Sequence, residues 1–569
     1  MKTQSMIALL AMVAVGCSGT GSFSQDSAEQ GAVEIAFGSG GLASLRYDGV
    51  ELLKDGTFKL RDAQLVNWED DAVPPPDGEP RRTADPRTNT AMLDCWWGQA
   101  RCAYEARGNR LNMTVTVTNR TEAVLNLALL QLLELKFPRA IKGYELGLRK
   151  GHNREAPTVV TIDFDGGVMS LVNDDVGRGL YLGVARREGE KKATKTDFIP
   201  DQSKMGYQAT DTYPIIVANA RTDAFYNKWL NDPHIRRPIY PGATDTFHVS
   251  LRFGPPGADP GSLAGDVCRK FAQAYPRTFK WDDRRPIGML FFGGQSLAKE
   301  DNPRGWGGAL RPKADINTPQ GREEFKKNLL ALADRVVANL KAMNCQGVIV
   351  WDFEGYGSPG ATYVGDPRSL PPEIEAAADE FFKKFTDAGL RVGCTLRPQF
   401  PGRPCYADTR HAGQVEVFEP SFILHQKVAY AKKRWGATLF YVDSNSKFDP
   451  YGRYNDEGSY ELMSATVFEK VARMHPDVLL MPEHENERYY AYTAPYNELR
   501  QGYTGTPDNI RRIYPDAFCI LRLADGPVKA RWKELVASIR KGDVMIIHAD
   551  SVSRELLQLY KEAQGPAAD

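Results

Sequence analysis

The pattern of apolar residues changes near residue 284, and this change constrains the fold more than any other feature of the chain. Before it, short runs alternate apolar and polar residues with a period of two, as in 111–118 (LNMTVTVT) and 246–253, and turn residues separate the runs. Such alternation is typical of strands that bury one face. We therefore predict a large antiparallel β-sandwich over residues 31–280.

From residue 281 onward, short continuous apolar runs alternate with amphipathic helical segments. Continuous apolar strands separated by helices predict a parallel sheet that is buried on both faces. Seven such runs are clear, at 287–292, 347–351, 391–396, 438–442, 477–481, 518–523 and 544–547, and a weaker one at 498–504 would be the sixth of eight. This favours a (β/α)8 (TIM) barrel over residues 281–569. A doubly wound open sheet is the alternative, although no G-x-G-x-x-G follows its first strand.

The N-terminus has the pattern of a targeting segment. Lys2 precedes the apolar stretch 6–15 (MIALLAMVAV), which is too short to span a bilayer and has the length of a signal-peptide core. A small residue before Cys17 resembles the cleavage box of bacterial lipoproteins. We therefore predict a lipoprotein-type signal peptide at 1–17, a linker at 18–30, and export to the bacterial cell envelope. Plain secretion into the periplasm or medium, without a lipid, is the alternative.

Composition excludes several partners. The 569 residues include 72 Lys and Arg against 72 Asp and Glu, so no charge excess favours nucleic acid or an anionic membrane. We expect membrane contact only through a lipid on Cys17. No C-x-x-C and no clustered His/Cys spacing occurs, so we predict no metal site and no cofactor. Cys95 and Cys102 are close enough in sequence to bridge a hairpin in an oxidising compartment.

Carboxylates follow five of the predicted barrel strands. Catalytic residues of such barrels lie at the C-terminal ends of the strands, and here Asp443 follows the fourth strand while Glu483 and Glu485 follow the fifth. Crowded carboxylates push one another's pKa values apart, and glycoside hydrolysis needs such a pair. We predict Asp443 and Glu483 as catalytic, with substrate contacts from Asp352, Glu354, Arg397, Asn445, Glu485, Asp525 and Asp550.

Each of these residues also has a structural interpretation. Asp443 could cap a helix, but it shares its strand phase with Leu439 and Tyr441, which favours catalysis. Glu483 is favoured over Glu485 because it is closer to the strand end. The remaining carboxylates could serve as caps or loop ion pairs, and Arg397 suits neutralisation of the acidic mouth better than a substrate clamp. The tyrosines between residues 489 and 496 fit a sugar-binding loop or ordinary packing.

A sandwich followed by a barrel with Asp443 after strand four and Glu483 after strand five resembles a group of retaining α-glycosidases. The α-amylase superfamily shares the carboxylate placement, and the closer architectural resemblance is to the bacterial α-N-acetylgalactosaminidase and endo-α-N-acetylgalactosaminidase families, which act on mucin-type glycans. The resemblance implies Asp443 as nucleophile, Glu483 as acid/base, and Asp352 as a sugar contact. A group resembling α-galactosidases takes its acid from strand six, where Glu498 or Asp508 stands, so this arrangement stays open.

The sequence therefore predicts an exported glycoside hydrolase that cleaves α-linked sugars by a retaining double displacement. Its substrate would be an oligosaccharide or glycan carrying an α-N-acetylgalactosaminide or α-galactoside. A non-catalytic surface glycan-binding lipoprotein and a structural envelope lipoprotein are the alternatives. Five strand-end carboxylates argue against a pure binder, because crowded negative charge contributes little to binding a neutral sugar.

Overall fold

The computed structural model describes residues 31–53, 61–66, 72–73, 80–136, 142–146, 159–164, 166–176, 181–187, 196–198, 212–218, 238–300, 302–355, 365–398, 420–443, 445 and 463–565. The predicted signal peptide and the predicted linker lie outside these ranges. Within them, no helix combines the length and the apolar character needed to cross a membrane.

The first half of the chain consists of antiparallel strands. Their bounds are Val33–Gly38 (β1), Gly41–Tyr47 (β2), Val50–Glu51 (β3), Arg61–Val66 (β4), Ala72–Val73 (β5), Arg81–Asp85 (β6), Thr90–Cys95 (β7), Gly98–Arg107 (β8), Arg110–Asn119 (β9), Asn126–Lys136 (β10), Lys142–Leu146 (β11), Val159–Phe164 (β12), Gly167–Asn173 (β13), Tyr181–Arg187 (β14), Thr196–Phe198 (β15), Thr212–Ala218 (β16) and Thr244–Gly254 (β17). They form an eight-stranded sheet (β11-β12-β13-β17-β9-β8-β7-β6), a six-stranded sheet (β15-β14-β16-β10-β4-β5) and a three-stranded sheet (β1-β2-β3).

The two large sheets share one apolar core, which confirms the predicted β-sandwich. Alternate residues of β9 are buried, and their neighbours between them are partly exposed, as the period-two pattern predicts. The buried β9 side chains pack in one cluster with leucines of β10 in the other sheet. The hydroxyl of Tyr104 on β8 donates a 2.6 Å hydrogen bond to the carbonyl oxygen of Leu132 on β10, so the sheets are also joined by a polar contact.

The suggested disulfide between Cys95 and Cys102 is absent, and both thiols are free. The two-residue turn Trp96–Trp97 pairs Cys95 with Gly98, whereas Cys102 pairs with Ala91. The two cysteines therefore lie at different positions along the hairpin, too far apart in register to bridge. Cys102 is fully buried, and burial raises the pKa of its thiol to about 12, so it behaves as a core residue.

The second half forms the predicted barrel. Its strands are Ile287–Phe291 (β18), Gly347–Trp351 (β19), Arg391–Leu396 (β20), Leu439–Val442 (β21), Leu479–Pro482 (β22), Tyr496–Glu498 (β23), Ile520–Arg522 (β24) and Val544–His548 (β25). All neighbouring pairs are parallel, in the order β22-β21-β20-β19-β18-β25-β24-β23. The backbone N–H of Ala494 donates to the carbonyl of Leu480 at 3.1 Å, which brings the two edge strands together and nearly closes the ring.

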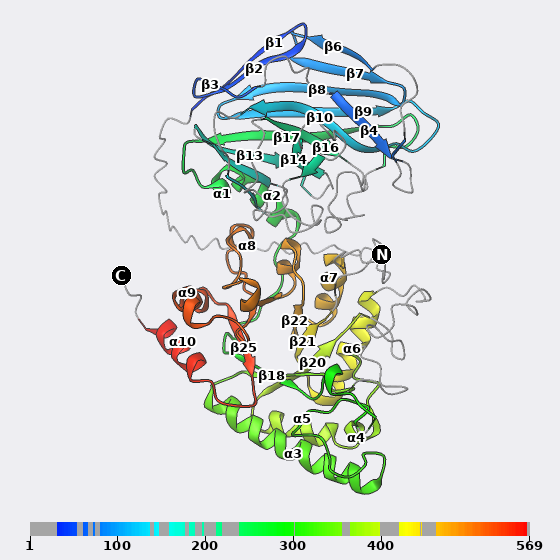
Figure 1. Cartoon of the computed structure of the whole chain (residues 1–569), viewed down its shortest axis with the longest axis vertical. Helices are drawn as coiled ribbons and strands as arrows, with labels where there is room; N and C mark the ends of the chain where they lie inside the picture. The colour runs from blue at the N-terminus through cyan, green and yellow to red at the C-terminus, as the bar shows by residue number, and fades with distance from the viewer. Residues whose placement is uncertain are drawn as a thin grey trace, which may run out of the picture.

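Helices surround the barrel (Figure 1). They are Pro319–Ala342 (α3), Pro372–Glu375 (α4), Ala378–Asp387 (α5), Pro420–Trp435 (α6), Ala465–Met474 (α7), Asp508–Ile513 (α8), Trp532–Arg540 (α9) and Arg554–Gln564 (α10). Thr318 caps α3 as its sequence indicates, because its hydroxyl accepts from the N–H of Gly321 at 3.1 Å. One apolar cluster fills the space between strands and helices, and a second fills the barrel interior.

Two short helices, Pro260–Leu263 (α1) and Gly265–Ala274 (α2), connect the halves and lie between the sandwich and the barrel in Figure 1. The segment that follows them closes the N-terminal end of the barrel. Phe279 and Trp281 belong to the cluster inside the barrel, and the indole N–H of Trp281 donates to the side-chain oxygen of Gln346 at 3.0 Å. This end is therefore filled, which leaves the C-terminal ends of the strands for a site.

Candidate functional site

Strand phase determines which residues line the open end of the barrel. In β21, Leu439 and Tyr441 belong to the interior cluster, so the next residue in phase is Asp443. Paired residues of parallel strands point to the same face, so the same rule applies around the barrel. It brings to the mouth the side chains of Phe291, Trp351, Arg397, Asp443, Glu483, Glu498, Arg522 and His548.

Asp443 and Arg397 form a buried ion pair at this mouth. Asp443 is 6% exposed and Arg397 is 2% exposed. Nε of Arg397 donates to Oδ2 of Asp443 at 3.0 Å, and a terminal guanidinium nitrogen donates to the same oxygen. Nζ of Lys427, which is fully buried, donates to the carbonyl oxygen of Arg397 at 2.6 Å. Arg397 thus compensates the charge of Asp443, and the hydrogen bond from Lys427 fixes the backbone of Arg397.

Glu483 lies beside Asp443 on the neighbouring strand. Val442 pairs with Pro482, and the N–H of Glu483 donates to the carbonyl of Val442 at 2.9 Å, so the two carboxylates are at adjacent positions in the register. Glu483 is only partly buried, and its Oε2 lies 3.6 Å from Nε2 of His484. The pair therefore combines an enclosed carboxylate with one that is open to solvent.

Asn445 and Glu485 hold the loops around this pair. Asn445 is fully buried, and its amide donates to the carbonyl of His484 at 3.0 Å while its oxygen accepts from the His484 N–H at 2.9 Å. Glu485 accepts hydrogen bonds from Asn497 at 3.1 Å and from the hydroxyl of Tyr490. These contacts join the ends of β21, β22 and β23. That the two residues also contact substrate stays a prediction.

The run of tyrosines between residues 489 and 496 serves packing. Tyr489 and Tyr490 are fully buried and Tyr492 is 5% exposed. Their rings belong to the cluster between strands and helices, and the ring of Tyr489 packs edge-on against Phe468 of α7. Of the two interpretations of this run, the structure supports packing for these three residues.

Asp352 and Glu354 follow β19 and are both buried, at 3% and 1% exposure. Asp352 adopts a positive φ of 58°, a strained conformation for a residue with a side chain. Oε1 of Glu354 accepts from the N–H of Gly365 at 2.6 Å, while its buried Oε2 has no hydrogen-bond partner among the described residues. Burial, together with the charge of Asp352, raises the pKa of Glu354 to about 7. Glu354 therefore carries a proton for much of the time near neutral pH.

Glu498, at the end of β23, is held as a carboxylate. It accepts hydrogen bonds from Arg500 at 2.6 Å and from Arg522 at 2.9 Å, as well as from Gln501 and Tyr496. Burial opposes ionisation, but these donors outweigh it and lower the pKa of Glu498. The sequence identified Glu498 as an alternative acid but did not identify Arg522 as its partner. The strand phase of β24, which places Arg522 opposite Glu498, would have identified Arg522.

The last two predicted contacts are exposed. Asp525 follows β24 with a positive φ of 62° and pairs with Arg522 at 3.1 Å, and Asp550 lies in the loop after β25. The structure therefore brings Asp525 close to the Arg522 and Glu498 cluster. Whether either aspartate reaches a substrate stays a prediction.

A series of aromatic rings lines the barrel below and beside the carboxylates, and sequence reasoning did not single it out. Ring centroids are 5.4 Å apart for Phe291 and Trp351, 5.0 Å for Trp351 and Tyr441, and 4.9 Å for Tyr441 and Tyr496. His548 lies 5.7 Å from Phe291. Phe291 is 38% exposed although it ends a barrel strand. The same parity that identified Asp443 would have identified these rings.

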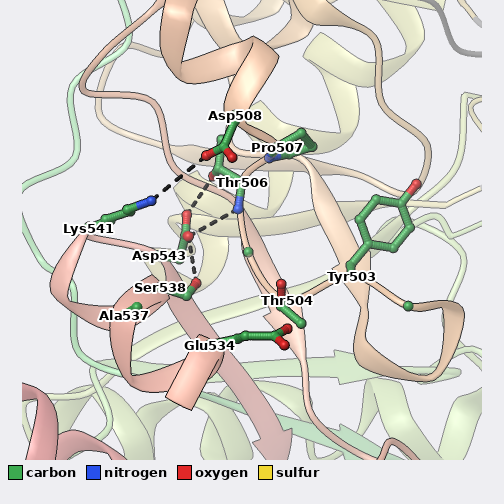
Figure 2. Close-up of a pocket in the computed structure, with 12 residues that line it drawn as sticks. Tyr503, Thr504, Thr506, Pro507, Asp508, Glu534, Ala537, Ser538, Lys541 and Asp543 are labelled. Carbon is green, nitrogen blue, oxygen red and sulfur yellow. Dashed lines mark hydrogen bonds and ion pairs between the residues drawn. The ribbon is translucent and has the colours of Figure 1, made fainter. Parts of the chain in front are cut away.

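A cavity of about 360 Å³ lies outside the barrel interior, between the loop that leads into α8 and helix α9, beside the start of β25. Figure 2 shows Thr506 and Ser538 directed at Asp543, which immediately precedes β25. Asp543 accepts from the Thr506 N–H at 3.0 Å and from the Ser538 hydroxyl at 2.6 Å, so its carboxylate is engaged in holding the base of the barrel. Asp508, the other strand-six alternative, lines this cavity and faces Lys541, which places it away from the mouth.

No family model matches the sequence, and no curated protein does either. Among solved structures, the α-N-acetylgalactosaminidase NagBb from Bifidobacterium bifidum, in complex with GalNAc, is 11% identical with a TM-score of 0.50, over 94% of this chain and 91% of that one. The α-galactosidase from Lactobacillus brevis is 10% identical with a TM-score of 0.44, over 94% and 82%. The GH36 α-galactosidase AgaB from Geobacillus stearothermophilus is 12% identical with a TM-score of 0.41, over 90% and 76%. At the level of the fold, the sandwich and barrel of this chain resemble those of the bifidobacterial α-N-acetylgalactosaminidase, as the sequence implied.

Proposed function

We propose that this protein is an exported retaining glycoside hydrolase that cleaves α-linked sugars, with α-N-acetylgalactosaminides or α-galactosides as its substrates. The observation that carries the proposal is the pairing of Asp443, enclosed and bonded to Arg397, with Glu483 at the adjacent position of the next strand. The shared fold with a bifidobacterial α-N-acetylgalactosaminidase supports the choice of substrate.

The register suits a retaining mechanism. Neighbouring strands are ~4.8 Å apart, and retaining enzymes hold their two carboxyl groups ~5–5.5 Å apart. Asp443 would attack the anomeric carbon as the glycosidic bond breaks, and the proton of Glu483 would go to the leaving oxygen. Glu483 would then take a proton from water, whose oxygen attacks the same carbon and releases Asp443.

The environments of the carboxylates support these roles. A carboxylate nucleophile must be deprotonated, and the cation of Arg397 at hydrogen-bonding distance favours this form of Asp443. Glu483 must exchange a proton with solvent, and it is the partly exposed member of the pair. Glu498 is a poor proton donor because its arginine partners lower its pKa. Glu485 is bonded to Tyr490 and Asn497, which suits a positioning role.

The test is a panel of aryl α- and β-glycosides of N-acetylgalactosamine, galactose, glucose and fucose. Wild type and the Asp443→Asn variant are assayed together, with Asp334→Asn, which changes an exposed aspartate of helix α3 outside the barrel mouth, as a matched control. We expect release from an α-glycoside by wild type and the control, and none by Asp443→Asn. Equal turnover by Asp443→Asn would refute the nucleophile. Glycan affinity with no turnover of either aryl or natural glycans would favour the binding-protein alternative.

Export is part of the proposal and rests on the sequence of residues 1–17. Lipid attachment at Cys17 is tested by expressing the full chain in a bacterial host fed a labelled fatty acid. We expect label in wild type and none in Cys17→Ala. Release of unlabelled wild type into the periplasm or medium would indicate plain secretion instead.

A further inference from the structure

Two large aromatic side chains are exposed on neighbouring turns of the sandwich. Trp96 is 47% exposed in the β7–β8 turn, and Tyr240 is 62% exposed in the turn before β17. Among the described residues of the sandwich, these are the only large hydrophobic side chains with such exposure. An isolated exposed ring needs no explanation, but two rings on adjoining turns form a surface.

Backbone hydrogen bonds place the two turns side by side. The N–H of Arg120 donates to the carbonyl of Trp97 at 2.9 Å, and the N–H of Gly242 donates to the carbonyl of Asn119 at 3.1 Å. The end of β9 thus lies between the two turns. Because β8, β9 and β17 are consecutive in the sheet, the turns are about two strand spacings, or ~10 Å, apart.

The turns are built rigidly. Trp97, the next residue after Trp96, is 2% exposed, and its buried side chain anchors the hairpin. Gly98 has a φ of 152°, and a Cβ there would lie 1.9 Å from the carbonyl oxygen of Thr118, so this position accepts only glycine. The amide of Asn119, fully buried, donates to the carbonyl of Ile239 at 2.9 Å and fixes the residue before Tyr240. The rings therefore project from a preorganised base.

Hydrogen-bonding groups lie at the strand ends that carry the two turns. Asp94 accepts from the side chain of Gln99 at 2.8 Å and pairs with the half-exposed Arg120 at 3.4 Å. Thr118 and Thr244 share a 2.9 Å hydrogen bond between exposed hydroxyls. Rigid aromatic faces beside neutral and balanced polar groups match the chemistry of a sugar chain, whose C–H faces stack on rings while its hydroxyls bond to the polar groups.

We propose that Trp96 and Tyr240 form an accessory binding surface for a neutral glycan chain, on the sandwich and separate from the residues of the barrel mouth. The class of ligand rests on the proposed function, because a hydrolase of glycans would gain from holding the polymer it cleaves. The core of a protein interface is more apolar than the rest of the surface, whereas the described sandwich surface exposes no large hydrophobic side chain besides these two rings. The two rings lie near the first residue of β8, Gly98, at one end of the sheet. The chain leaves β17 toward the barrel at the opposite end, where Arg107, the last residue of β8, lies.

The test uses native affinity electrophoresis of the full protein in gels cast with galactomannan or with mucin. All variants are made in the Asp443→Asn background so that turnover cannot alter the polymer. We expect retarded migration of the parent in at least one gel, about tenfold weaker affinity for Trp96→Ala or Tyr240→Ala, and retained affinity for Trp96→Tyr. Met474→Ala, which removes an exposed apolar side chain from α7, is the control and should migrate as the parent does.

Three results would overturn the accessory surface. They are migration of the parent unaffected by either polymer, retardation that survives the double Trp96→Ala/Tyr240→Ala change, and a concentration-dependent self-association that the same change abolishes.

Cleavage of a soluble aryl α-glycoside is measured separately on Trp96→Ala with Asp443 intact, and we expect it to equal wild type. That assay also confirms that the variant folds. Polymer binding that depends on Trp96 in a protein without hydrolase activity would leave the surface standing and reject the proposed hydrolase.

Discussion

Two nitrogens of Arg397 donate to a single oxygen of Asp443, with Nε at 3.0 Å. Arg397 follows β20 and Asp443 follows β21, so this ion pair joins the ends of two neighbouring barrel strands. Both side chains are more than nine-tenths buried. The contact therefore acts on stability and on the proposed chemistry at once, and substitutions can separate the two effects.

Replacing Arg397 by Ala leaves a buried carboxylate without its cation. We expect a loss of about 3–5 kcal/mol in the free energy of unfolding and at least about a hundredfold loss in kcat. Arg397→Lys restores the charge without the planar pair of donors, so it should recover stability more fully than kcat. Denaturant unfolding and aryl-glycoside kinetics on both variants measure this. Wild-type kcat in Arg397→Ala would contradict a role for the pair in turnover.

Glu354 should make stability fall as the pH rises. Its pKa is about 7 in the folded protein against an ordinary value of 4.5, so the folded state binds the extra proton between these values. Stability should therefore decrease by roughly 3 kcal/mol between about pH 4.5 and pH 7 through this group alone, and level off above. Glu354→Gln keeps the neutral shape and should lack this slope. Identical pH dependence of unfolding in wild type and Glu354→Gln would show that the carboxyl titrates normally.

Glu498 should have the opposite dependence. Its pKa is lowered in the folded protein, so the stability that it contributes is present above the ordinary pKa and is lost as the pH falls through the folded value. Glu498→Gln should therefore cost stability at neutral pH and little in strong acid. The difference in the free energy of unfolding between wild type and Glu498→Gln should therefore grow as the pH rises, whereas the difference between wild type and Glu354→Gln should shrink. The two differences thus have slopes of opposite sign. Slopes of the same sign would be inconsistent with the environments described.

The role of Glu483 as the acid can be identified from how the loss of kcat in Glu483→Gln depends on the leaving group of the substrate. Without an acid, a glycoside with a basic alkoxide leaving group should lose about 10²–10⁴-fold in kcat, whereas a nitrophenyl glycoside should lose much less. Glu483→Gln should show this dependence, and Glu498→Gln and Glu485→Gln should not. A steep leaving-group dependence in one of the latter two variants, and not in Glu483→Gln, would reassign the acid.

Asn445 should matter through the loops that it joins. Asn445→Ala removes both hydrogen bonds between the buried Asn445 amide and the partly buried backbone of His484, at an expected cost of about 1–3 kcal/mol. Asn445→Asp keeps one acceptor and loses the donor, so it should fall between Ala and wild type in Tm. A Tm unchanged in Asn445→Ala would mean that water replaces the amide.

The barrel was predictable because its strands are buried on both faces, which produces continuous apolar runs that helices separate. The same regularity made strand phase predictable, and Asp443 was identified by its parity with Leu439 and Tyr441. The sixth strand was misplaced. It spans Tyr496–Glu498 and not 498–504, because a short helical turn at Leu499–Gln501 and Gly502, with a φ of 94°, end it early.

Long-range partners account for what the sequence did not predict. The spacing of Cys95 and Cys102 suits a hairpin bridge, but the two-residue turn sets a register that separates them. The sequence near Glu498 carries no sign that Arg522 neutralises it, because the two residues meet only when β23 and β24 pair. The tyrosines at 489 and 490 were ambiguous because burial depends on helix α7, which packs over them.

The central claim is that Asp443 is the nucleophile of a retaining hydrolase. It is tested most directly by incubating wild type with a fluorinated α-glycosyl fluoride that forms the glycosyl-enzyme faster than it is hydrolysed, followed by peptide mass mapping. We predict one added glycosyl group on the peptide that contains Asp443, and no label in Asp443→Asn. A label on a different carboxylate, or turnover of aryl glycosides without any trapped intermediate and with inversion at the anomeric carbon, would contradict the account.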